Sequence, residues 1–561
     1  MQVFAIAVIG AFAVEAGAQN IRRARPLLPG EVRPVRDGLS WDTAYVNLQD
    51  ALNFRAAQSL SSSWEVWVAG KHVPPASTRT QAGVARTETF RNFRRNTTIL
   101  GGFNGTETGA SQRSPALYRT ILSGDVDNDD TFLGNTWTLV TIGNIDGPGQ
   151  GTVDITLVFD GLTLEAGAAD TVGRHTGACV NFFSGYSARF VNCTLRNNRA
   201  GSAGATNGQG AAVVLQNTGA PVFESCTFQS NQSNGEGGAV WINGATNGAT
   251  FQGCIFDANE ARLGAAIYNY GSPVTLTNCV FTSNSAALQG GAVLRLQGGS
   301  VTATGCMFST NTAGVVSAFV SAAPSDFAEG GALSLQSTEA AQATDRFTDC
   351  RFEFNTTDAL PGPGKPWVAA SNRGAGAVHH INGALKISRC VFLENVLPQA
   401  GNAQGAAIRA YSSAPNNYTH GSNITIDRSI FQDNAAPSGR GGAVNTFRGR
   451  LAIYSSVFFR NTALSDGSAV FYDDPPIISG PTRAAILVAN SLFHANGCVT
   501  NQTGTGCLAA ANGVVAAQGD SEIINCTVQM IPAQNSPLQP DGVGGDLQRC
   551  LGEQRVLLAA S

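Results

Sequence analysis

Apolar residues recur along most of this chain in pairs that lie two positions apart. In the stretch PVTLTNCVFTSN, residues 273–284, Val274 and Leu276 alternate with polar residues, and Cys279 and Phe281 do the same. A period of two places each pair on one face of a β-strand, and we expect that face to be buried. The step from Leu276 to Cys279 is odd, so a turn must separate the two strands if both pairs point inward.

The same phrase returns many times with its apolar positions kept. CVFTSNSAALQGGAV at 279–293 matches CTFQSNQSNGEGGAV at 226–240 in its Cys, Phe, Asn and Gly-Gly-Ala. Units that repeat every 25 to 44 residues indicate a solenoid, in which each unit buries its apolar face against its neighbours. The units begin at Cys193, Cys226, Cys254, Cys279, Cys306, Cys350, Cys390, Ser429, Ser456, Ser491 and Cys526.

Turn-forming residues separate the predicted strands of each unit. One turn precedes the Cys or Ser, at positions such as Asn192, Gly253 and Asn278, and a second falls at the Asn three residues after the Phe, as at Asn284. Gly-Gly-Ala then opens a third strand. Three strands and three turns per coil predict an all-β fold, a triangular right-handed parallel β-helix of eleven or twelve coils, about 55 Å long at about 4.8 Å per coil.

Composition agrees with this architecture and removes one class of partner. The chain has 561 residues, 65 of them Gly, and only 13% are charged, which suits many tight turns and much buried strand. The formal net charge of −4 is small and creates no long-range positive field. We therefore expect no nucleic-acid partner.

The N-terminal residues favour export. An apolar run from Val3 to Val14 precedes Ala16-Gly17-Ala18, a pattern that signal peptidase cuts, although no Lys or Arg precedes the run. Since no other stretch reaches 18 apolar residues, we expect no transmembrane span in the mature chain. The predicted organisation is a signal peptide over 1–18, an exposed Arg- and Pro-rich linker over 19–38, a cap with the first coils over 39–150, β-helix repeats over 151–530 and a C-terminal tail over 531–561.

Two parts of the chain resemble known families. Phrases such as GGAVWI from Gly237 and FTSN from Phe281, spread over 155–530, resemble the GGA(I/V/L) and FxxN repeats of the chlamydial polymorphic outer membrane proteins. Within 37–130, DGLSWDTAYVNLQDAL, WEVWVAGKHVPP and ILGGFNGTETGASQRSPALYRTILSGDVDNDD resemble the start of large secreted bacterial proteins with a right-handed, pectate-lyase-like β-helix. This second resemblance implies an N-terminal cap with a helix from about Trp41 to Ala57, then strands at EVWVAG and TILGGF.

The resemblance sets the functional alternatives. Polymorphic membrane proteins end in a long autotransporter barrel, whereas only some 35 residues follow Cys526, so we expect no self-export through a barrel. Such relatives are linked to surface display and adhesion, and the other branch of the fold cleaves acidic polysaccharides. We predict a secreted or cell-surface rod with a structural or adhesive role, which needs no cofactor and binds cell-surface glycans or proteins. The alternative is a polysaccharide lyase or glycoside hydrolase on the same fold.

Most cysteines belong to the repeat. Eight of the twelve start a unit, where Ser also occurs, and stacked side chains stay about 4.8 Å apart, too far for bridged Cβ atoms. We therefore expect buried free thiols at these positions. Cys498 and Cys507 flank the loop VTNQTGTG and form the best disulfide candidate, whereas Cys179 and Cys550 have no obvious mate.

Three sets of residues are candidates for chemistry, each with a plainer interpretation. DVDNDD at 125–130 places Asp125, Asp127 and Asp129 like the first half of a calcium loop, but the Gly and Glu of an EF-hand are absent, so a solvated acidic turn is the alternative. By register, Glu394 and Asp433 lie on adjacent coils about 5 Å apart, near the spacing of a retaining glycosidase pair.

Register counting also stacks His379 beside Arg409 and then Asn445. The plainer interpretation of His379 and Arg409 is an ordinary contact on the outer face. For Glu394 and Asp433, which Arg460 follows in the same column, the plainer interpretation is solvated surface charge.

Two neighbouring coils carry long insertions. The gap between the turn Asn and the next Gly widens from Asn311 to Gly330 and again from Asn355 to Gly376. Insertions at one repeat position emerge at one corner of the coil, so we expect the two loops to lie side by side. The second loop holds Lys365, Trp367 and Arg373, a combination that suits stacking on a sugar or protein partner, although tolerated surface elaboration is the alternative.

Overall fold

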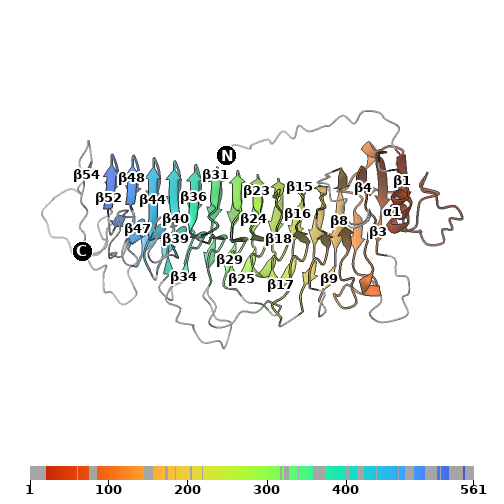
Figure 1. The fold of residues 1–561 in the computed structure, drawn as a ribbon, viewed down its shortest axis with the longest axis horizontal. Helices are drawn as coiled ribbons and strands as arrows, with labels where there is room; N and C mark the ends of the chain where they lie inside the picture. The colour runs from red at the N-terminus through yellow and green to blue at the C-terminus, as the bar shows by residue number, and fades with distance from the viewer. Residues whose placement is uncertain are drawn as a thin grey trace.

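The computed structural model shows a rod of stacked coils (Figure 1). It describes residues 20–549 apart from 60, 75–84, 144–155, 171–174, 184, 203–204, 218, 316, 318, 321–327, 339, 358–372, 398–402, 414–421, 438, 465–466, 474–484, 499–514, 518–519 and 530–547. In the described part of the chain, no helix is long and apolar enough to cross a membrane.

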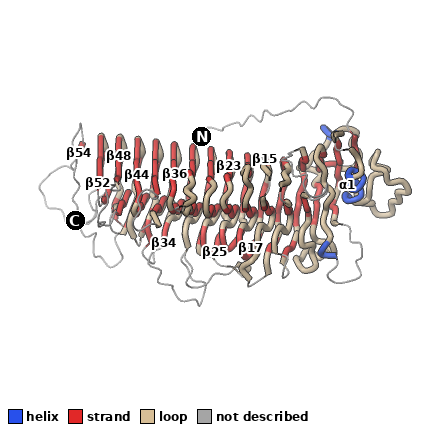
Figure 2. The backbone as a smooth tube through the Cα atoms, viewed as in Figure 1, coloured by secondary structure: helices blue, strands red, loops and turns tan. Residues whose placement is uncertain are grey.

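A complete coil contributes one strand to each of four sheets, which we name C, A, B and D in chain order. One such coil consists of β22 Ile267–Tyr270, β23 Pro273–Thr277, β24 Val280–Thr282 and β25 Ser285–Gln289. Each of these strands pairs in parallel with its equivalents in the coils before and after. The strands therefore stack along the rod as a parallel β-helix (Figure 2).

The strands of each sheet follow coil order. The 15-stranded sheet A contains β1 Asn20–Ala24, β2 Trp64–Ala69, β4 Thr97–Phe103, β7 Leu157–Asp160, β11 Arg189–Val191, β15 Val222–Glu224, β19 Ala249–Gln252, β23, β27 Ser300–Thr304, β31 Thr344–Thr348, β36 Gly383–Ser388, β40 Ser422–Asp427, β44 Gly449–Tyr454, β48 Ala485–Ala489 and β52 Asp520–Ile524. The 15-stranded sheet B contains β3 Lys71–His72, β5 Thr120–Ser123, β8 Leu162–Glu165, β12 Thr194–Arg196, β16 Thr227–Gln229, β20 Ile255–Asp257, β24, β28 Met307–Ser309, β32 Arg351–Glu353, β37 Val391–Leu393, β41 Ile430–Gln432, β45 Val457–Phe459, β49 Leu492–His494, β53 Thr527–Gln529 and the antiparallel β54 Gln548–Arg549.

The other two sheets are smaller. The 12-stranded sheet C contains β6 Val140–Ile142, β10 Val180–Phe182, β14 Val213–Gln216, β18 Val240–Asn243, β22, β26 Val293–Leu296, β30 Leu333–Gln336, β35 Val378–Ile381, β39 Ile408–Tyr411, β43 Val444–Phe447, β47 Val470–Asp473 and β51 Val515–Ala517. Sheet D is formed in three parts by β9 Ala168–Ala169, β13 Arg199–Ala200, β17 Gln232–Glu236, β21 Glu260–Leu263, β25, β29 Thr312–Ala313 and β33 Thr356–Thr357, then β34 Arg373–Gly374 with β38 Ala403–Gln404, and β42 Ala435–Ala436 with β46 Thr462–Ala463 and β50 Gly497–Cys498.

The predicted interior stacks are present. The rings of Phe256, Phe281 and Phe308 are buried and nearly parallel, with centroids 4.6 and 4.8 Å apart. The Asn of the second turn forms a second ladder inside the rod. Asn284 Nδ2 donates to Asn311 Oδ1 of the next coil at 2.9 Å and to Phe256 O of the preceding coil at 2.9 Å.

Two columns of left-handed residues mark the predicted turns. Residues just before the ladder Cys or Ser have positive φ, as at Asn192 and Asn278, and so do residues just before the ladder Asn, as at Ser283 and Glu394. A left-handed residue lets the chain change direction between two strands within two residues. The cysteines whose side chains the structure describes are buried and unbridged: Cys179, Cys193, Cys226, Cys254, Cys279, Cys306, Cys350, Cys390 and Cys526.

A polar cluster interrupts the apolar interior between sheets C and A. Arg295 and Asp345 are completely buried and form an ion pair. Arg295 Nη1 also donates to Ser337 Oγ at 2.7 Å, and Val301 N donates to Asp345 Oδ1 at 2.8 Å. His380 lies 3.8 Å from the same carboxylate, and burial lowers the pKa of His380 to about 3.

Three expectations need correction. The coil has four strands, because the segment between the ladder Asn and the Gly turn adds the short strands of sheet D. The 19–38 segment is no simple exposed linker, since β1 pairs with β2 and Arg33 is buried. The cap helix α1 spans only Leu48–Ala56, with Asn47 as its N-cap, although β2 and β4 form where the resemblance implied strands.

Candidate functional site

Sheet C carries a continuous column of side chains that point away from the main core and are nevertheless buried. In β18 the first and third residues, Val240 and Ile242, belong to the main core, so the second residue points outward. The register aligns these second residues along the rod as Val214, Trp241, Tyr268, Leu294, Ser334, His379, Arg409 and Asn445.

A second column runs beside the first at the end of sheet D. Its members pair from coil to coil as Glu236, Leu263, Gln289, Glu329 and Gly374. We name the two facing columns the C–D seam. The seam is formed because the chain turns sharply at Gly237 and its equivalents. The φ of Gly237 is +65°, and an added Cβ would lie 2.3 Å from Val240 O.

The N-terminal part of the seam combines aromatic rings with a carboxylate. Trp241 Nε1 donates to Glu236 Oε2 at 2.7 Å, and Gln209 Nε2 donates to the same oxygen at 3.2 Å. Burial, reinforced by Glu236, raises the pKa of Tyr268. Tyr270, the next outward residue of its strand, is 40% exposed. Trp241 and Tyr268 are buried against Val214 and Leu294, so in this part of the seam the ring that faces solvent is that of Tyr270. An exposed ring beside fixed polar groups is typical of surfaces that bind sugars or proteins.

The C-terminal part of the seam centres on Glu329. Gln289 Nε2 donates to Glu329 Oε2 at 3.0 Å, and His379 Nδ1 lies 3.2 Å from the same oxygen. Burial raises the pKa of Glu329 to about 7, against the opposing effect of Arg409, and the side chain of Glu329 is only 12% exposed. His379 is fully buried, and burial holds its pKa well below the usual range. The 3.2 Å separation of Nδ1 and Oε2 is within hydrogen-bond distance, so the neutral imidazole can donate to the carboxylate or accept from the protonated carboxyl group.

Arg409 and Tyr411 complete this cluster. The guanidinium carbon of Arg409 lies 5.4 Å from the centre of the Tyr411 ring, and His379 lies 5.6 Å from that ring. Burial lowers the pKa of Arg409 and raises the pKa of Tyr411. A carboxyl group with a pKa near neutrality beside a buried cation can give or take a proton at physiological pH.

Both long insertions return to the coil beside this cluster. They leave the coil after Ala313 and Thr357, which pair with each other, and return at Glu329 and Gly374, which also pair. An added Cβ at Gly374 would lie 1.9 Å from Arg409 Cδ, so the returning backbone touches the cluster directly. The structure thus places the return points of both insertions beside His379 and Arg409, which the sequence suggested as a separate candidate.

The loop residues themselves stay predictions. Lys365 and Trp367 lie outside the described residues, and Arg373 is described only as backbone of β34. The same limit applies to the predicted disulfide, because Cys498 is described only as backbone of β50 and Cys507 lies outside the described residues.

The predicted carboxylate pair lies at the left-handed corner before the Asn ladder. Glu394 and Asp433 have φ values of 50° and 54° on adjacent coils, as register counting placed them. Arg460 Nε and Nη2 bind the two oxygens of Asp433 at 2.7 and 2.6 Å. This hydrogen-bonded ion pair lowers the pKa of Asp433, so Asp433 is ionised and serves as a partner for Arg460. A catalytic role for the pair stays a prediction.

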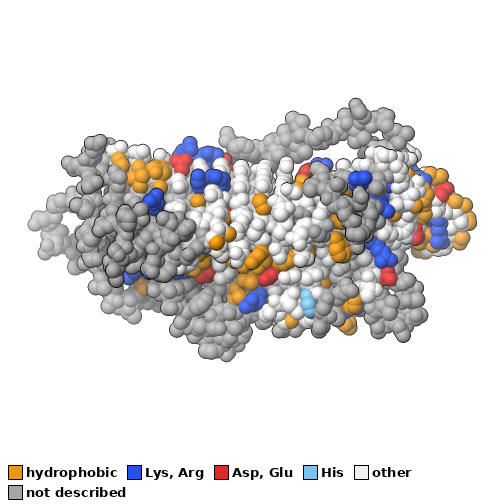
Figure 3. Space-filling model, in the orientation of Figure 1, with side chains coloured by type: hydrophobic (Ala, Val, Ile, Leu, Met, Phe, Trp, Pro, Cys, Tyr) orange, Lys and Arg blue, Asp and Glu red, His pale blue; other side chains and the backbone are white. Residues whose placement is uncertain are grey.

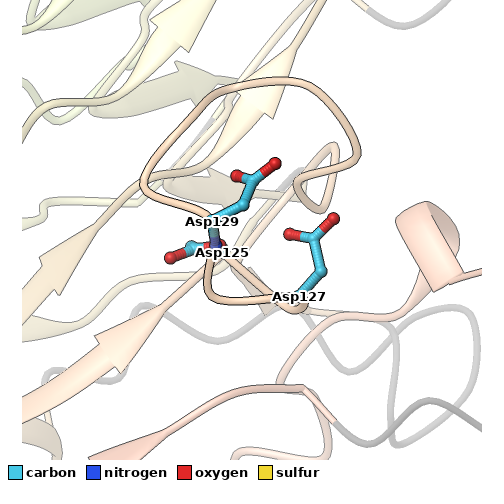
Figure 4. Close-up of side chains that lie close together, drawn as sticks. All are labelled: Asp125, Asp127 and Asp129. Carbon is cyan, nitrogen blue, oxygen red and sulfur yellow. The ribbon is translucent and has the colours of Figure 1, made fainter.

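The three aspartates of the DVDNDD turn do come together. Figure 4 shows Asp125, Asp127 and Asp129 on one loop, and their nearest oxygens lie within 4.8 Å of one another. Lys71 Nζ lies 3.6 Å from Asp125 Oδ2, and Asp129 N donates to Asp125 Oδ1 at 3.2 Å. Partial burial, with Asp129 and Asp125 nearby, raises the pKa of Asp127. Three carboxylates suit a hard cation such as Ca²⁺, but the ammonium of Lys71 already neutralises part of their charge.

A cavity of about 280 Å³ adjoins this turn. Lys71, Asp125, Glu165 and Arg196 line it, together with Phe132. Arg196 Nε donates to Glu165 Oε2 at 2.7 Å, so the charged groups of the cavity are largely paired with one another. The cavity offers polar contacts and one aromatic wall and carries little net charge.

Sequence reasoning found His379 and Arg409 but missed Glu329. A signal was available, since the residue before the Gly pair is Glu236 in EGGAV, Gln289 in QGGAV and Glu329 in EGGAL. The Gly that follows makes the turn into sheet C. An acid or amide that recurs directly before this Gly therefore indicates a column of polar side chains beside sheet C.

Comparison with known proteins agrees with this topology. Residues 176–424 match the family model of the right handed beta helix region. The fold is a right-handed parallel β-helix. Two solved structures of PfbA, a surface adhesin of Streptococcus pneumoniae, are similar at 10% identity; one covers 86% of this chain and 87% of that chain with a TM-score of 0.34, the other 89% and 98% with 0.35. A solved rhamnogalacturonan lyase is similar at 13% identity over 90% of this chain and 87% of that chain, with a TM-score of 0.24. No curated protein sequence matches the chain.

Proposed function

We propose that the protein is a secreted or surface-exposed rod with an adhesive role, which binds a cell-surface glycan or protein at the C–D seam. One observation carries the proposal. The two longest insertions return to the coil at Glu329 and Gly374, directly beside the cluster of Glu329, His379 and Arg409. Loops that border a rigid, polar and aromatic surface are the usual construction of a binding site.

The chemistry of the seam suits a hydroxyl-rich ligand. Tyr270, Gln336 and Tyr411 are the next outward residues after the buried column, and they offer two rings and an amide to solvent. Aromatic rings stack on the apolar faces of sugars, and buried acids and amides hold the polar groups behind them in place.

Binding is tested on glycan and surface-protein arrays with the purified chain. For any ligand found, Tyr411→Ala and Arg409→Gln are expected to weaken binding about tenfold or more, since each removes a ring or a cation of the seam. Arg351→Gln is the matched control, because Arg351 lies on the outer face of sheet B and pairs with Glu353. Unchanged binding in both seam variants would remove the seam as the site.

The alternative function is cleavage of a polysaccharide at the same place, as a lyase or a hydrolase. The pKa of about 7 at Glu329, beside Arg409, favours it because such a carboxyl can serve as an acid or a base. Incubation with neutral and acidic polysaccharides, followed by assays for new reducing ends and unsaturated products, tests this alternative. Turnover that disappears in Glu329→Gln while ligand binding persists would assign catalysis, and no product from any polymer would exclude those substrates.

A further inference from the structure

Two positive side chains stand next to each other on the outer face of sheet A. Arg346 of β31 and Lys386 of β36 are partners in register, and both are exposed. Like charges at directly paired positions destabilise a sheet. In the part of the chain that the structure describes, neither side chain belongs to an ion pair. No ion pair within the described chain therefore offsets their repulsion.

The surroundings extend the positive charge. Arg450 lies on the same face two coils beyond Lys386, beside Asn423. Arg389 and Arg428 border the face, but their charges are met by Asp349 at 2.7 Å and by Asp427 at 2.7 Å. Figure 3 shows Lys and Arg side chains gathering over the strands that Figure 1 labels β31, β36 and β40. We name Arg346, Lys386 and Arg450 the basic strip. The strip is positively charged although the whole chain has a negative net charge.

Hydroxyl and amide groups accompany the cations. Thr302 is the partner of Arg346 on one side, and Thr425 is the partner of Lys386 on the other. Ser388 and Asn423 lie on the same outer face. Paired residues on adjacent strands lie about 4.8 Å apart, so one anionic group between Arg346 and Lys386 would contact both.

We propose that the basic strip binds a linear glycan that carries sulfate or carboxylate groups. Such a polymer lies along the rod axis, its anions meet Arg346 and Lys386, and its hydroxyls meet Thr302, Thr425 and Asn423. A nucleic acid fits less well, because base stacking needs exposed aromatic rings beside the cations, and the residues that pair with Arg346 and Lys386 on the adjacent strands are Thr302 and Thr425. A membrane fits less well for the same reason, since these two paired side chains are polar and offer nothing for insertion. The site lies on another face from the C–D seam and does not depend on the function proposed there.

Binding to immobilised heparin and to polygalacturonate, each over a range of salt concentrations, tests the strip. The double variant Arg346→Gln with Lys386→Gln is expected to bind about tenfold more weakly and with a shallower salt dependence. The matched control is Arg351→Gln with Arg460→Gln, which removes two exposed cations from the sheet B side, and it is expected to bind within about twofold of the wild type. Binding of heparin alone or of polygalacturonate alone supports the strip and identifies the anionic group.

Three results would overturn the proposal. They are equal losses of glycan binding in the two double variants, absence of binding to both glycans at low salt, and binding confined to DNA or to vesicles of anionic phospholipid.

Thermal unfolding gives a second readout that needs no ligand. Removing a like-charge pair should leave the melting temperature unchanged or slightly higher, whereas a clear decrease would assign the pair a structural role and reject the site.

Discussion

Several of the Cys and Ser residues that start a coil both donate and accept a hydrogen bond. Cys306 Sγ donates to Thr304 O at 3.5 Å and accepts from Cys279 N of the preceding coil at 3.4 Å. Ser429 Oγ likewise donates to Asp427 O at 2.9 Å and accepts from Cys390 N at 3.1 Å. The position thus needs a small side chain that can both donate and accept, which explains why Cys and Ser replace each other there.

This arrangement separates two substitutions at one residue. Cys306→Ser should cost less than about 1 kcal/mol, because the hydroxyl keeps both hydrogen bonds. Cys306→Ala should cost about 1–3 kcal/mol, because the buried N–H of Cys279 loses its acceptor. Urea unfolding of the two variants beside the wild type checks the order. Equal stability of the Ser and Ala variants would contradict this role of the sulfur.

A buried histidine near the cap makes stability depend on pH. His72 is 2% exposed, its Nε2 lies 3.0 Å from Ala69 O, and burial lowers its pKa to about 4. The unfolded chain binds a proton near pH 6.5, so between about pH 6.5 and 4 the folded state binds fewer protons and stability falls as pH falls. At pH 5 this term is about 2 kcal/mol.

Replacement of His72 isolates this term. The decrease in melting temperature from pH 7 to pH 5 should be smaller in His72→Gln than in the wild type. A smaller decrease should remain, since burial also lowers the pKa of His380 to about 3, with the same sign. Identical decreases in the two proteins would show that His72 titrates normally.

At the scale of elements, the Asn ladder ties each turn to the next coil. Asn284 Oδ1 accepts from Asn259 N at 3.1 Å and from Asn259 Nδ2 at 2.9 Å, in addition to the two bonds that its own Nδ2 donates. Asn284→Ala should cost roughly 2–4 kcal/mol, because two buried donors lose their acceptor. Thr282→Ala on the outer face of the same coil is the control and should be nearly neutral, as measured by chemical unfolding.

The Phe stack stabilises the neighbouring strand β24 by packing. Phe281 is fully buried between the rings of Phe256 and Phe308. Phe281→Ala should cost about 3–5 kcal/mol, as for other buried Phe truncations, and Phe281→Leu should cost less than about 2 kcal/mol because it keeps most of the volume. A destabilisation below about 1 kcal/mol for the Ala variant would show that the coils tolerate the cavity.

The elements with a strong side-chain pattern could be predicted, and those without one could not. Val274, Leu276 and Phe281 alternate in burial as their spacing predicts. Sheet D was missed because SAALQ at 285–289 shows no period of two, and its strands pair through main-chain hydrogen bonds. His379 and Arg409 were found by counting residues along the repeat, whereas Glu329 ends an insertion that disrupts such counting.

At the scale of the whole molecule, local stacking lets insertions vary without disturbing the rod. Each strand pairs with the coils directly before and after it, so an insertion must satisfy only its own exit and return positions. The register shows what a coil without an insertion looks like. Ala286 is equivalent to Thr357, and Gln289 is equivalent to Gly374. Only Ala287 and Leu288 lie between Ala286 and Gln289.

This equivalence predicts the result of removing the second loop. A variant in which Ala-Leu replaces residues 358–373 should keep the coil, with a melting temperature within about 3 °C of the wild type. If the loop forms the binding edge with the seam, the same variant should lose the ligand found on the arrays. The control replaces residues 474–484, between sheets C and A, with Gly-Ser, as Gly271 and Ser272 connect the equivalent strands. Binding should survive in the control. Binding that also survives replacement of residues 358–373 would place the ligand elsewhere. A large fall in the melting temperature of that variant would mean that the loop supports the rod.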